Sequence, residues 1–542
     1  MRKTPSLPRL SIAATGDSPR ELFQCAERAL GYSRFVELRL DWLPRPAQAL
    51  SQIRRLLESR AGGRGTKTIL QATCRRASNG GRFRGTVAEQ IEILRKAVEA
   101  GCRIVDLEIE SAESAGSEAI QDFRQNDLRQ KAALILSWHD FQGTPPLDAI
   151  ARRLRRFPAD YYKLVPTATR QTDNCDVLGF LRSSVAEARD HEGRLERWVV
   201  FSMEQAGIPS RVLALSRGSA FVYASCPDIG NREQGRGKRE EKLAAPGQID
   251  YEILRRVYRA EKLTLQTAIY GLLGHPIGHS VGSAIHNAAF RARKLDAVYL
   301  PLLSSNLQDF REAAERYPLS GFSVTIPHKQ GILNLLDRVD PVARLTGAAN
   351  TVRIRHGLWE ATNSDVEGVA SPLRKAFRLT GGQSLGRNFR AVVVGTGGAA
   401  RAALVALGKL RCGQILIAGR NPEKVATLAR DFGATALPIS QLEQEQFDLM
   451  IHATPVGMWP HTGECLLRPE QISAGTVFDL VYNPRDTRLL QLARARGCRT
   501  IPGLDMFIAQ AARQFEYWTG EEAPRPLMRH TAERELARFP KR

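Results

Sequence analysis

Short apolar segments alternate with amphipathic ones through the first 258 residues of the chain. The apolar segments are rich in Val, Ile, Leu and aromatic residues, a composition that favours β-strands. Between most of them the apolar positions recur at helical spacing, as in residues 87–101 and 147–157. The pattern predicts strands at residues 9–14, 35–42, 68–74, 103–109, 133–140, 161–166, 198–203 and 220–225.

This alternation favours a (β/α)8 barrel in the first half. Eight strand–helix units in about 250 residues have the size and rhythm of that fold. An open doubly wound sheet shows the same alternation, so periodicity alone leaves this alternative open.

A second strand-and-helix series begins after residues 258–268, which contain no Gly or Ser and therefore predict a short connection. Its strands are expected at residues 267–275, 297–303 and 321–327, followed by a hairpin at 350–365, a new βαβ series from 389 and helices over 504–539. We therefore predict an α/β chain of three domains, a barrel (1–260), a second domain (266–385, completed by the C-terminal helices 504–542) and a Rossmann-like nucleotide-binding domain (386–503).

The clearest nucleotide signal is a strand that runs into a glycine-rich turn and then directly into a helix. Gly395, Gly397 and Gly398 form this turn, whose backbone N–H groups and helix N-terminus suit a pyrophosphate. The next strand ends at Arg420 and Asn421, and an arginine there suits the 2′-phosphate of NADP(H). A glycine turn without a nucleotide and a solvated surface arginine are the alternatives.

Five segments of the second half, residues 270–290, 321–329, 347–351, 363–365 and 503–512, stand in a characteristic order. Together they resemble shikimate dehydrogenase, and the resemblance covers residues 267–540. The resemblance implies that Lys329 and Asp365 form the catalytic pair, which suits proton transfer to or from the oxygen of a reacting carbonyl. It also implies a substrate pocket lined by Ser280, Thr325, Asn350, Tyr482 and Gln510, and further cofactor contacts from Gly503 and Met506.

One position departs from the shikimate dehydrogenase pattern. Gly282 stands where the family has a second serine, with Ser283 one place further along. The lost hydroxyl removes a donor for the substrate carboxylate and opens space near ring C1, where quinate carries an additional hydroxyl. We therefore hypothesise some tolerance of quinate, or weaker shikimate binding.

In the first half, polar residues stand near the carboxyl ends of the predicted strands. In a barrel these ends share one mouth, where such enzymes place their chemistry. The residues are Glu37, Arg39, Arg75, Glu108, His139, Lys163, Met203, Arg211 and Gln248. This set and its order resemble type I 3-dehydroquinate dehydratase over residues 1–258.

The resemblance implies that Lys163 forms a Schiff base with the substrate ketone and that His139 moves the protons. An apolar strand around Lys163 should lower its pKa, and histidine titrates near neutrality. Arg211 and Gln248 would hold the carboxylate. Glu37, Arg39 and Arg75 would bind ring hydroxyls or brace the site.

Two positions depart from the dehydratase pattern. Asn79 replaces an acid that would partner the histidine, and Ala244 replaces a serine that would contact the substrate. These changes put the tuning of His139 and one substrate contact in question.

Composition changes this picture little. The 542 residues carry 78 Lys and Arg against 57 Asp and Glu, a net charge of +21. The charges are scattered and no nucleic-acid motif accompanies them, so we prefer a basic surface to a nucleic-acid-binding protein. Eight dispersed cysteines without a CxxC spacing, and the lack of any apolar run long enough to span a bilayer, favour a cytoplasmic protein without a structural metal.

Together these features predict one chain that performs two successive reactions on small-molecule substrates. It would dehydrate 3-dehydroquinate to 3-dehydroshikimate and reduce that product to shikimate with NADPH, using no metal, membrane or specific nucleic-acid partner. A quinate/shikimate dehydrogenase with a catabolic role and a catalytically silent ligand sensor built on the same domains are the alternatives.

Overall fold

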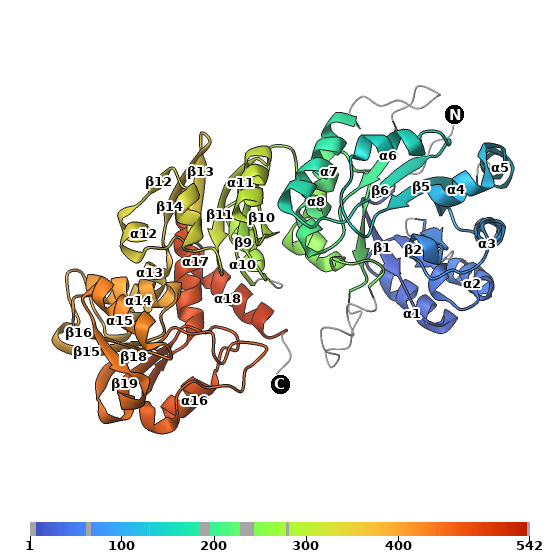
Figure 1. Ribbon diagram of the computed structural model, residues 1–542. Helices are drawn as coiled ribbons and strands as arrows, with labels where there is room; N and C mark the ends of the chain where they lie inside the picture. Colours follow the sequence, from blue (N-terminus) through green and yellow to red (C-terminus); the bar gives the residue numbers. More distant parts are fainter. Residues whose placement is uncertain are drawn as a thin grey trace. The chain divides into compact units, whose positions relative to one another are not determined.

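The computed structural model describes residues 7–60, 67–128, 131–184, 196–227, 243–277 and 281–538. The chain divides into two compact units (Figure 1). The first comprises Met1–Thr267 with Leu302–Ser304 and Gln308–Tyr317, and the second comprises the remainder. Within the described ranges, no helix has both the length and the apolarity that crossing a membrane requires.

The first unit contains an eight-stranded parallel sheet that curls into a nearly closed barrel. Its strand order is β7-β6-β5-β4-β3-β2-β1-β8. The segment before β8 meets β7 through hydrogen bonds from the Ala220 N–H to the Trp198 carbonyl at 2.7 Å and from the Val200 N–H to the Ser219 hydroxyl at 3.2 Å. The prediction of eight strands and a barrel is thus confirmed. The strands are β1 (Leu10–Ala14), β2 (Phe35–Arg39), β3 (Ile69–Thr73), β4 (Ile104–Glu108), β5 (Ala133–His139), β6 (Tyr161–Val165), β7 (Trp198–Val200) and β8 (Val222–Ser225).

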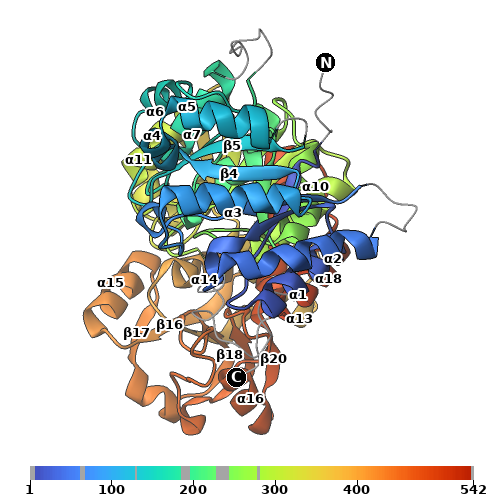
Figure 2. The same cartoon turned by 90° about the vertical axis from the view of Figure 1, so that its right-hand side faces the viewer.

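Helices cover the outside of these strands, as α3 does beside β4 (Figure 2). Thr86 and Glu89 begin α3 with a capping box, in which each side chain bonds the backbone of the other residue. The helices of this region are α1 (Pro19–Leu30), α2 (Leu50–Arg60), α3 (Val87–Glu99), α4 (Ile109–Ala115), α5 (Ser117–Asp122), α6 (Leu147–Leu154), α7 (Gln171–Ser184) and α8 (Ile208–Leu213).

The second unit begins with a mixed six-stranded sheet of order β10-β9-β11-β13-β14-β12. Strands β13 and β14 pair antiparallel as the predicted hairpin, whereas the two-residue β12 was not predicted. The strands are β9 (Ala268–Gly274), β10 (Ala297–Leu303), β11 (Leu319–Val324), β12 (Arg338–Val339), β13 (Thr351–Arg355) and β14 (Leu358–Thr362). The helices in this part of the chain are α10 (Val281–Ala292), α11 (Leu307–Arg316), α12 (Pro341–Thr346) and α13 (Asp365–Ala376).

The other sheet of the second unit is fully parallel, with the order β17-β16-β15-β18-β19-β20. This is the Rossmann arrangement, in which the order reverses between the first and fourth strands. Continuous apolar runs such as Ala391–Val394 are buried because helices cover both faces of a parallel sheet. The strands are β15 (Gly386–Val394), β16 (Cys412–Gly419), β17 (Thr435–Pro438), β18 (Phe447–His452), β19 (Ala474–Asp479) and β20 (Arg499–Ile501).

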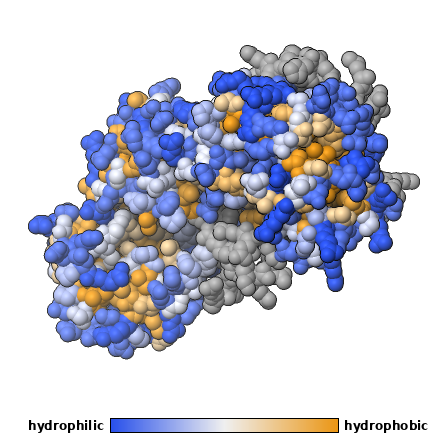
Figure 3. All heavy atoms as spheres, turned by 45° about the vertical axis from the view of Figure 1, so that its right-hand side comes forward, coloured by the Kyte–Doolittle hydropathy of each residue, from blue (hydrophilic) through white to orange (hydrophobic). Residues whose placement is uncertain are grey.

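Helices α14 (Gly398–Lys409), α15 (Pro422–Phe432) and α16 (Arg488–Ala495) accompany this sheet. The last two helices then pack on helices of the mixed-sheet part of this unit. Helix α17 (Gly503–Thr519) packs on α13, and α18 (Arg525–Leu536) packs on α10. On the face seen in Figure 3, hydrophilic side chains cover most of the surface and hydrophobic ones occur in separate patches.

Candidate active sites

A buried ion pair lies inside the barrel. Lys163 of β6 places its Nζ 2.9 Å from Oδ2 of Asp106 on β4. Ser137, on the strand between them, donates its hydroxyl to the other oxygen of Asp106 at 2.6 Å. The side chains of Lys163 and Asp106 are only 4% and 1% exposed. Asp106 was not among the residues predicted from the sequence.

Burial and charge oppose each other at this pair. Burial lowers the pKa of Lys163, and the carboxylates of Asp106 and Glu37 partly offset that shift. Burial alone would raise the pKa of Asp106, but the cations Lys163 and Arg75 outweigh it and lower this pKa. A lysine with a lowered pKa holds more free amine near neutral pH than an exposed lysine does.

A hydrogen-bond chain surrounds the amine. The Lys163 Nζ lies 4.2 Å from the centre of the Tyr223 ring, whose hydroxyl donates to Gln71 at 2.9 Å. Glu37 accepts from the Gln71 amide at 3.1 Å and from the Thr73 hydroxyl at 2.7 Å. Glu37 is therefore held within the barrel by two neutral donors.

His139 shares the interior face of the barrel with Lys163. Ser137 is the register partner of Lys163, and His139 lies two residues further along the same strand, so its side chain points to the same face. The His139 Nδ1 is buried without a hydrogen-bond partner among the described residues. Burial, followed by the charges of Arg75 and Lys163, holds the pKa of His139 well below its usual value. This shift favours the neutral imidazole and differs from the expectation that His139 titrates near neutrality.

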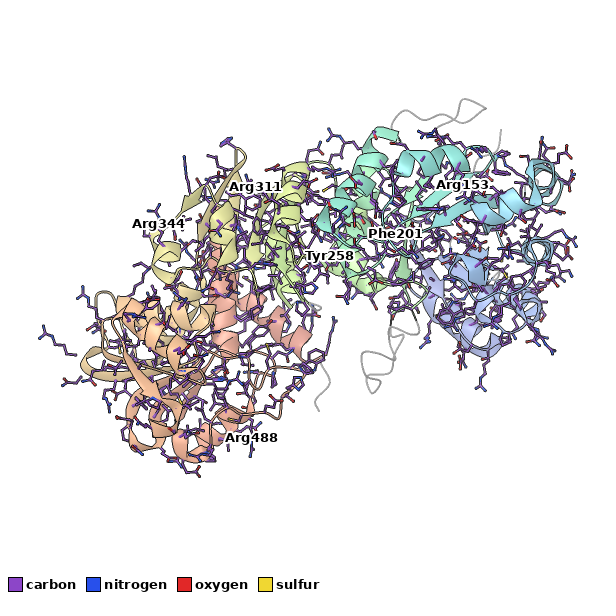
Figure 4. The ribbon with its side chains drawn as sticks, viewed as in Figure 1. Arg153, Phe201, Tyr258, Arg311, Arg344 and Arg488 are labelled. Atoms are coloured by element: carbon purple, nitrogen blue, oxygen red, sulfur yellow. The ribbon has the colours of Figure 1, made fainter. Side chains whose placement is uncertain are left out.

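Arg211 is a buried cation without a carboxylate partner among the described residues. Its guanidinium donates to the backbone carbonyls of Ser202 at 3.2 Å and Tyr223 at 3.4 Å. It lies 4.5 Å from the ring centre of Phe201, a residue marked in Figure 4. Burial lowers the pKa of Arg211 to about 9. The Gln248 Oε1 is likewise buried without a partner in the described chain.

The remaining predicted barrel residues differ in whether their side chains already form hydrogen bonds within the described chain. Arg39 is occupied, since it forms two hydrogen bonds with Asp41 at 2.9 and 2.8 Å and one with the Ala244 carbonyl at 2.8 Å. Arg75 has a buried Nε without a partner among the described residues. Asn79 donates to Glu110 at 3.0 Å.

Glu108 and Met203 complete the predicted set in the barrel. Glu108 accepts from the Arg76 N–H at 2.7 Å and from the Gln90 amide. Met203 is buried directly after β7. Glu108 thus braces the start of the loop after β3.

In the second unit, Lys329 meets Asp365 at the start of α13. The Lys329 Nζ lies 2.5 Å from Oδ2 of Asp365, and the Asn350 amide donates to the other carboxylate oxygen at 2.8 Å. Asp365 is 5% exposed and Lys329 is 21% exposed, so the carboxylate is buried while the amine reaches toward solvent. The pair therefore sits where a substrate could contact the amine.

The glycine-rich turn lies beside this pair. A Cβ on Gly395 would come within 2.8 Å of the Ala453 carbonyl, and its φ of +132° is unfavourable for any other residue. A Cβ on Gly398 would lie 3.4 Å from the Lys329 side chain, whereas space is open around Gly397. The turn and the α14 N-terminus thus form a cradle that fits a pyrophosphate next to the lysine.

Of the other predicted pocket residues, Tyr482 stacks on Phe507 with ring centres 4.2 Å apart. The Ser364 hydroxyl donates to Gln510 at 3.4 Å, beside Asp365. Thr325 is half-buried after β11. Ser280 lies outside the described residues.

Close packing positions the α17 residues. A Cβ on Gly503 would lie 2.3 Å from the Val481 carbonyl, and Met506 packs against Gly368 of α13. At the end of β16, Arg420 is exposed and Asn421 caps α15 by accepting the Lys424 N–H at 3.0 Å. Within the described ranges, no cluster of three or more His, Cys, Asp or Glu side chains could hold a metal ion.

Comparisons with known proteins match both halves of the chain. A model of type I 3-dehydroquinase matches residues 11–264. The shikimate dehydrogenase substrate-binding domain matches residues 272–352, shikimate/quinate 5-dehydrogenase matches 383–486 and the shikimate 5′-dehydrogenase C-terminal domain matches 503–533.

Relatives cover either the whole chain or its second half. A bifunctional 3-dehydroquinate dehydratase/shikimate dehydrogenase, chloroplastic, from Arabidopsis thaliana is 31% identical over 91% of this chain and 78% of its own length. A shikimate dehydrogenase (NADP(+)) from Microcystis aeruginosa is 38% identical over 49% of this chain and 96% of its own. The crystal structure of a Thermus thermophilus shikimate 5-dehydrogenase with NADP(H) and shikimate is 30% identical, covers 49% of this chain and 99% of that one, and has a TM-score of 0.44.

A barrel with a buried lysine, joined to a Rossmann-type dehydrogenase, defines a two-enzyme fusion. The chain belongs to the family of bifunctional type I 3-dehydroquinate dehydratase/shikimate dehydrogenases. Its activities are 3-dehydroquinate dehydratase and NADP-dependent shikimate dehydrogenase. The expected cytoplasmic location is wrong by this comparison, because the relative that matches 91% of the chain is chloroplastic. Dispersed cysteines and the lack of apolar runs do not distinguish the two compartments.

Proposed function

We propose that Lys163 and His139 carry out the dehydration of 3-dehydroquinate. The free amine of Lys163 adds to the C3 ketone and water is lost, which leaves an iminium. The iminium withdraws electrons and acidifies the C2 proton, which the neutral imidazole of His139 accepts. His139 then protonates the C1 hydroxyl as it leaves, and hydrolysis of the imine releases 3-dehydroshikimate and the amine.

Arg211 holds the substrate carboxylate in this proposal, with Gln248 beside it. A guanidinium fork matches a planar carboxylate, and Arg211 is buried without an acidic partner among the described residues. Glu37 and Arg75 face the ring hydroxyls, while Arg39 braces the site through Asp41. The presence of Lys163, His139 and an unpaired Arg211 in one barrel is the observation that carries the assignment.

Lys329 and Asp365 carry out the second reaction. NADPH, when bound, supplies a hydride to the ketone of 3-dehydroshikimate. The Lys329 ammonium donates a proton to the developing oxyanion, and Asp365, which contacts it, directs that ammonium. Asn350 orients the carboxylate, and Thr325, Tyr482, Gln510 and Ser280 complete the pocket for shikimate.

The cofactor assignment rests on the cradle and on Arg420. Gly395, Gly397 and Gly398 hold the pyrophosphate, Arg420 and Asn421 bind the 2′-phosphate end, and Gly503 and Met506 border the nicotinamide. We propose NADP(H) as the dinucleotide and no metal in either reaction. The names of the dehydrogenase relatives support this cofactor.

We also propose the domain boundaries 1–260, 266–385 completed by 504–542, and 386–503. Three separate sheets support this division, as does the packing of α17 on α13 and of α18 on α10.

Borohydride trapping tests the dehydratase assignment. Reduction of the full-length protein in the presence of 3-dehydroquinate should fix the ligand to Lys163, identified by mass mapping of peptides. An adduct on another lysine, or none in protein that retains shikimate oxidation, rejects the mechanism. A Lys163→Met protein that still dehydrates the substrate would do the same.

Quinate oxidation is the second candidate activity. Gly282, a buried residue of α10, favours it because the absent serine side chain opens space near ring C1, where quinate carries an additional hydroxyl. Steady-state kinetics with shikimate and quinate should show measurable oxidation of both, and Gly282→Ser should favour shikimate. Absence of quinate oxidation removes this candidate and leaves the shikimate assignment unchanged.

A further inference from the structure

Two neighbouring strands of the nucleotide-binding sheet end in a buried contact that the reaction above does not use. His452 ends β18 and Asp479 ends β19, and the two residues are register partners. The His452 Nδ1 lies 2.9 Å from Oδ1 of Asp479, with side chains only 2% and 0% exposed. Such a contact costs desolvation, so its other partners indicate what it does.

The partners of Asp479 fix the position of the proton on the imidazole. The carboxylate accepts the Val481 N–H at 3.0 Å and the Thr487 hydroxyl at 2.5 Å, so it acts as an acceptor throughout. The His452 Nδ1 therefore carries the proton that it donates to Asp479. The His452 Nε2 lies 2.5 Å from the Thr454 hydroxyl, and we assign the hydroxyl as the donor of this hydrogen bond.

The Thr454 hydroxyl in turn shapes the loop that follows β18. It accepts the Val456 N–H at 3.3 Å. The same loop touches the glycine-rich turn, since a Cβ on Gly395 would meet the Ala453 carbonyl at 2.8 Å. Strands β15 and β18 flank the reversal of strand order, and ligands of such sheets bind at the carboxyl ends there.

Asp479 also connects this contact to the residues around Tyr482, which is proposed to line the substrate pocket. Its bond to the Val481 N–H fixes the residue directly before Tyr482. Its bond to Thr487 fixes the N-cap of α16, which begins at Arg488 (marked in Figure 4). One buried pair thus holds two segments that leave adjacent strands at the same edge of the sheet.

Building on the proposed dehydrogenase function, we propose that His452 and Asp479 are positioning residues for both ligands. Through Thr454 they fix the loop 453–457 against the dinucleotide, and through Val481 they fix Tyr482 against the substrate. Neither residue touches a reacting atom in this proposal.

Two substitutions separate the effect on dinucleotide binding from the effect on substrate binding. His452→Phe keeps a flat ring but removes both hydrogen bonds, so it should raise the calorimetric Kd for NADP+ and the KM for shikimate, each by about tenfold. Thr454→Val keeps the side-chain shape and removes only the hydroxyl. It should weaken NADP+ binding by a similar factor and leave the KM for shikimate within about twofold.

Ser473→Ala is the matched control. Ser473 lies directly before β19, at the opposite end of the same strands, and its buried hydroxyl donates to the Leu442 and Glu445 carbonyls. This variant should lower thermal stability without changing either ligand constant by more than about twofold. If His452→Phe behaves like Ser473→Ala, the pair is merely structural and the proposal is wrong.

The tautomer gives a readout that does not depend on turnover. In ¹⁵N-histidine NMR of the full-length protein, one imidazole absent from the His452→Phe spectrum should show a protonated Nδ1 and an unprotonated Nε2. The reverse tautomer overturns the proposal. Wild-type protein that fails to bind NADP+ rejects the proposed cofactor itself, whereas wild-type binding with an unchanged His452→Phe variant rejects only this inference.

Discussion

At the scale of single residues, Asp106 controls how easily Lys163 gives up its proton. Burial lowers the lysine pKa and Asp106 opposes that shift. Asp106→Asn removes the opposing charge, so the Lys163 pKa should fall further and free amine should persist at lower pH. The rate of borohydride trapping, measured against pH, should reach half its maximum at a lower pH than in the wild type.

Trapping is the suitable readout here because the dehydration rate in the proposed mechanism also depends on His139. Ser137→Ala is the control, since it removes the 2.6 Å hydrogen bond to Asp106 but keeps the carboxylate charge. Its trapping midpoint should stay near that of the wild type. An Asp106→Asn midpoint that moves upward would show that the carboxylate does not stabilise the ammonium.

Arg211 is expected to contribute to substrate binding and not to the thermal stability of the protein. Arg211→Met removes the guanidinium proposed to hold the substrate carboxylate, and kcat/KM for 3-dehydroquinate should fall roughly 10- to 100-fold. The same change removes a buried charge that has no acidic partner among the described residues, so the thermal midpoint should not fall. Shikimate oxidation by the same preparation controls for protein quality. An unchanged KM would place the carboxylate elsewhere.

Some of these residues could be predicted from the sequence and one could not. Lys163 and His139 stood out as reactive side chains in apolar strands, and Arg211, which lies in α8, stood out because it completes a known order of motifs. Asp106 did not, although it lies two residues before Glu108 and therefore on the same face of β4. Its partner is 57 residues away, and a pairing across two strands follows from barrel closure, which a linear pattern does not contain.

At the scale of secondary-structure elements, the glycine-rich turn joins β15 to α14 in a way that only glycine allows at its first position. Gly395→Ala should cost about 1–3 kcal/mol of the free energy of unfolding, because it combines a positive φ with a clash. It should also weaken NADP+ binding, since the displaced loop carries Ala453 and Thr454.

Gly408→Ala tests whether this loss is specific to the turn. Gly408 lies in the exposed last part of α14, where a Cβ would meet no atom within 4 Å. Alanine there should stabilise the protein by about 1 kcal/mol and leave NADP+ binding unchanged. Thermal denaturation and calorimetry of the two variants measure both effects. Equal losses in both would mean that α14 tolerates no substitution at all.

Elements with a strong hydrophobic periodicity could be predicted from the sequence. The shortest strand and the contact between the end strands of the barrel could not. All eight barrel strands and the β13–β14 hairpin fall where alternation and apolar runs place them. The two-residue β12 has too few positions for any period. The hydrogen bonds between β7 and the segment before β8 depend on strand tilt, which hydrophobic patterns do not encode.

At the scale of the whole molecule, the catalytic residues proposed for each active site belong to one compact unit. Lys163, His139 and Arg211 belong to the first unit, and Lys329 and Asp365 belong to the second. Lys163→Met should therefore abolish dehydration while shikimate oxidation stays within about twofold of the wild type, and Lys329→Met should do the reverse. Absorbance of 3-dehydroshikimate and of NADPH follows the two reactions separately. Loss of both activities in either variant would show that the units depend on each other.

The same two variants address how the shared intermediate travels. Because each unit holds a complete set of proposed catalytic groups, 3-dehydroshikimate released by one chain should be a substrate for another. An equimolar mixture of Lys163→Met and Lys329→Met proteins should then convert 3-dehydroquinate to shikimate with NADPH, after a lag in which the intermediate accumulates. The steady rate should match, within about twofold, wild-type protein at the same concentration of intact sites. A mixture that stays far slower after the lag, at concentrations where each activity alone is normal, would require direct transfer within one chain.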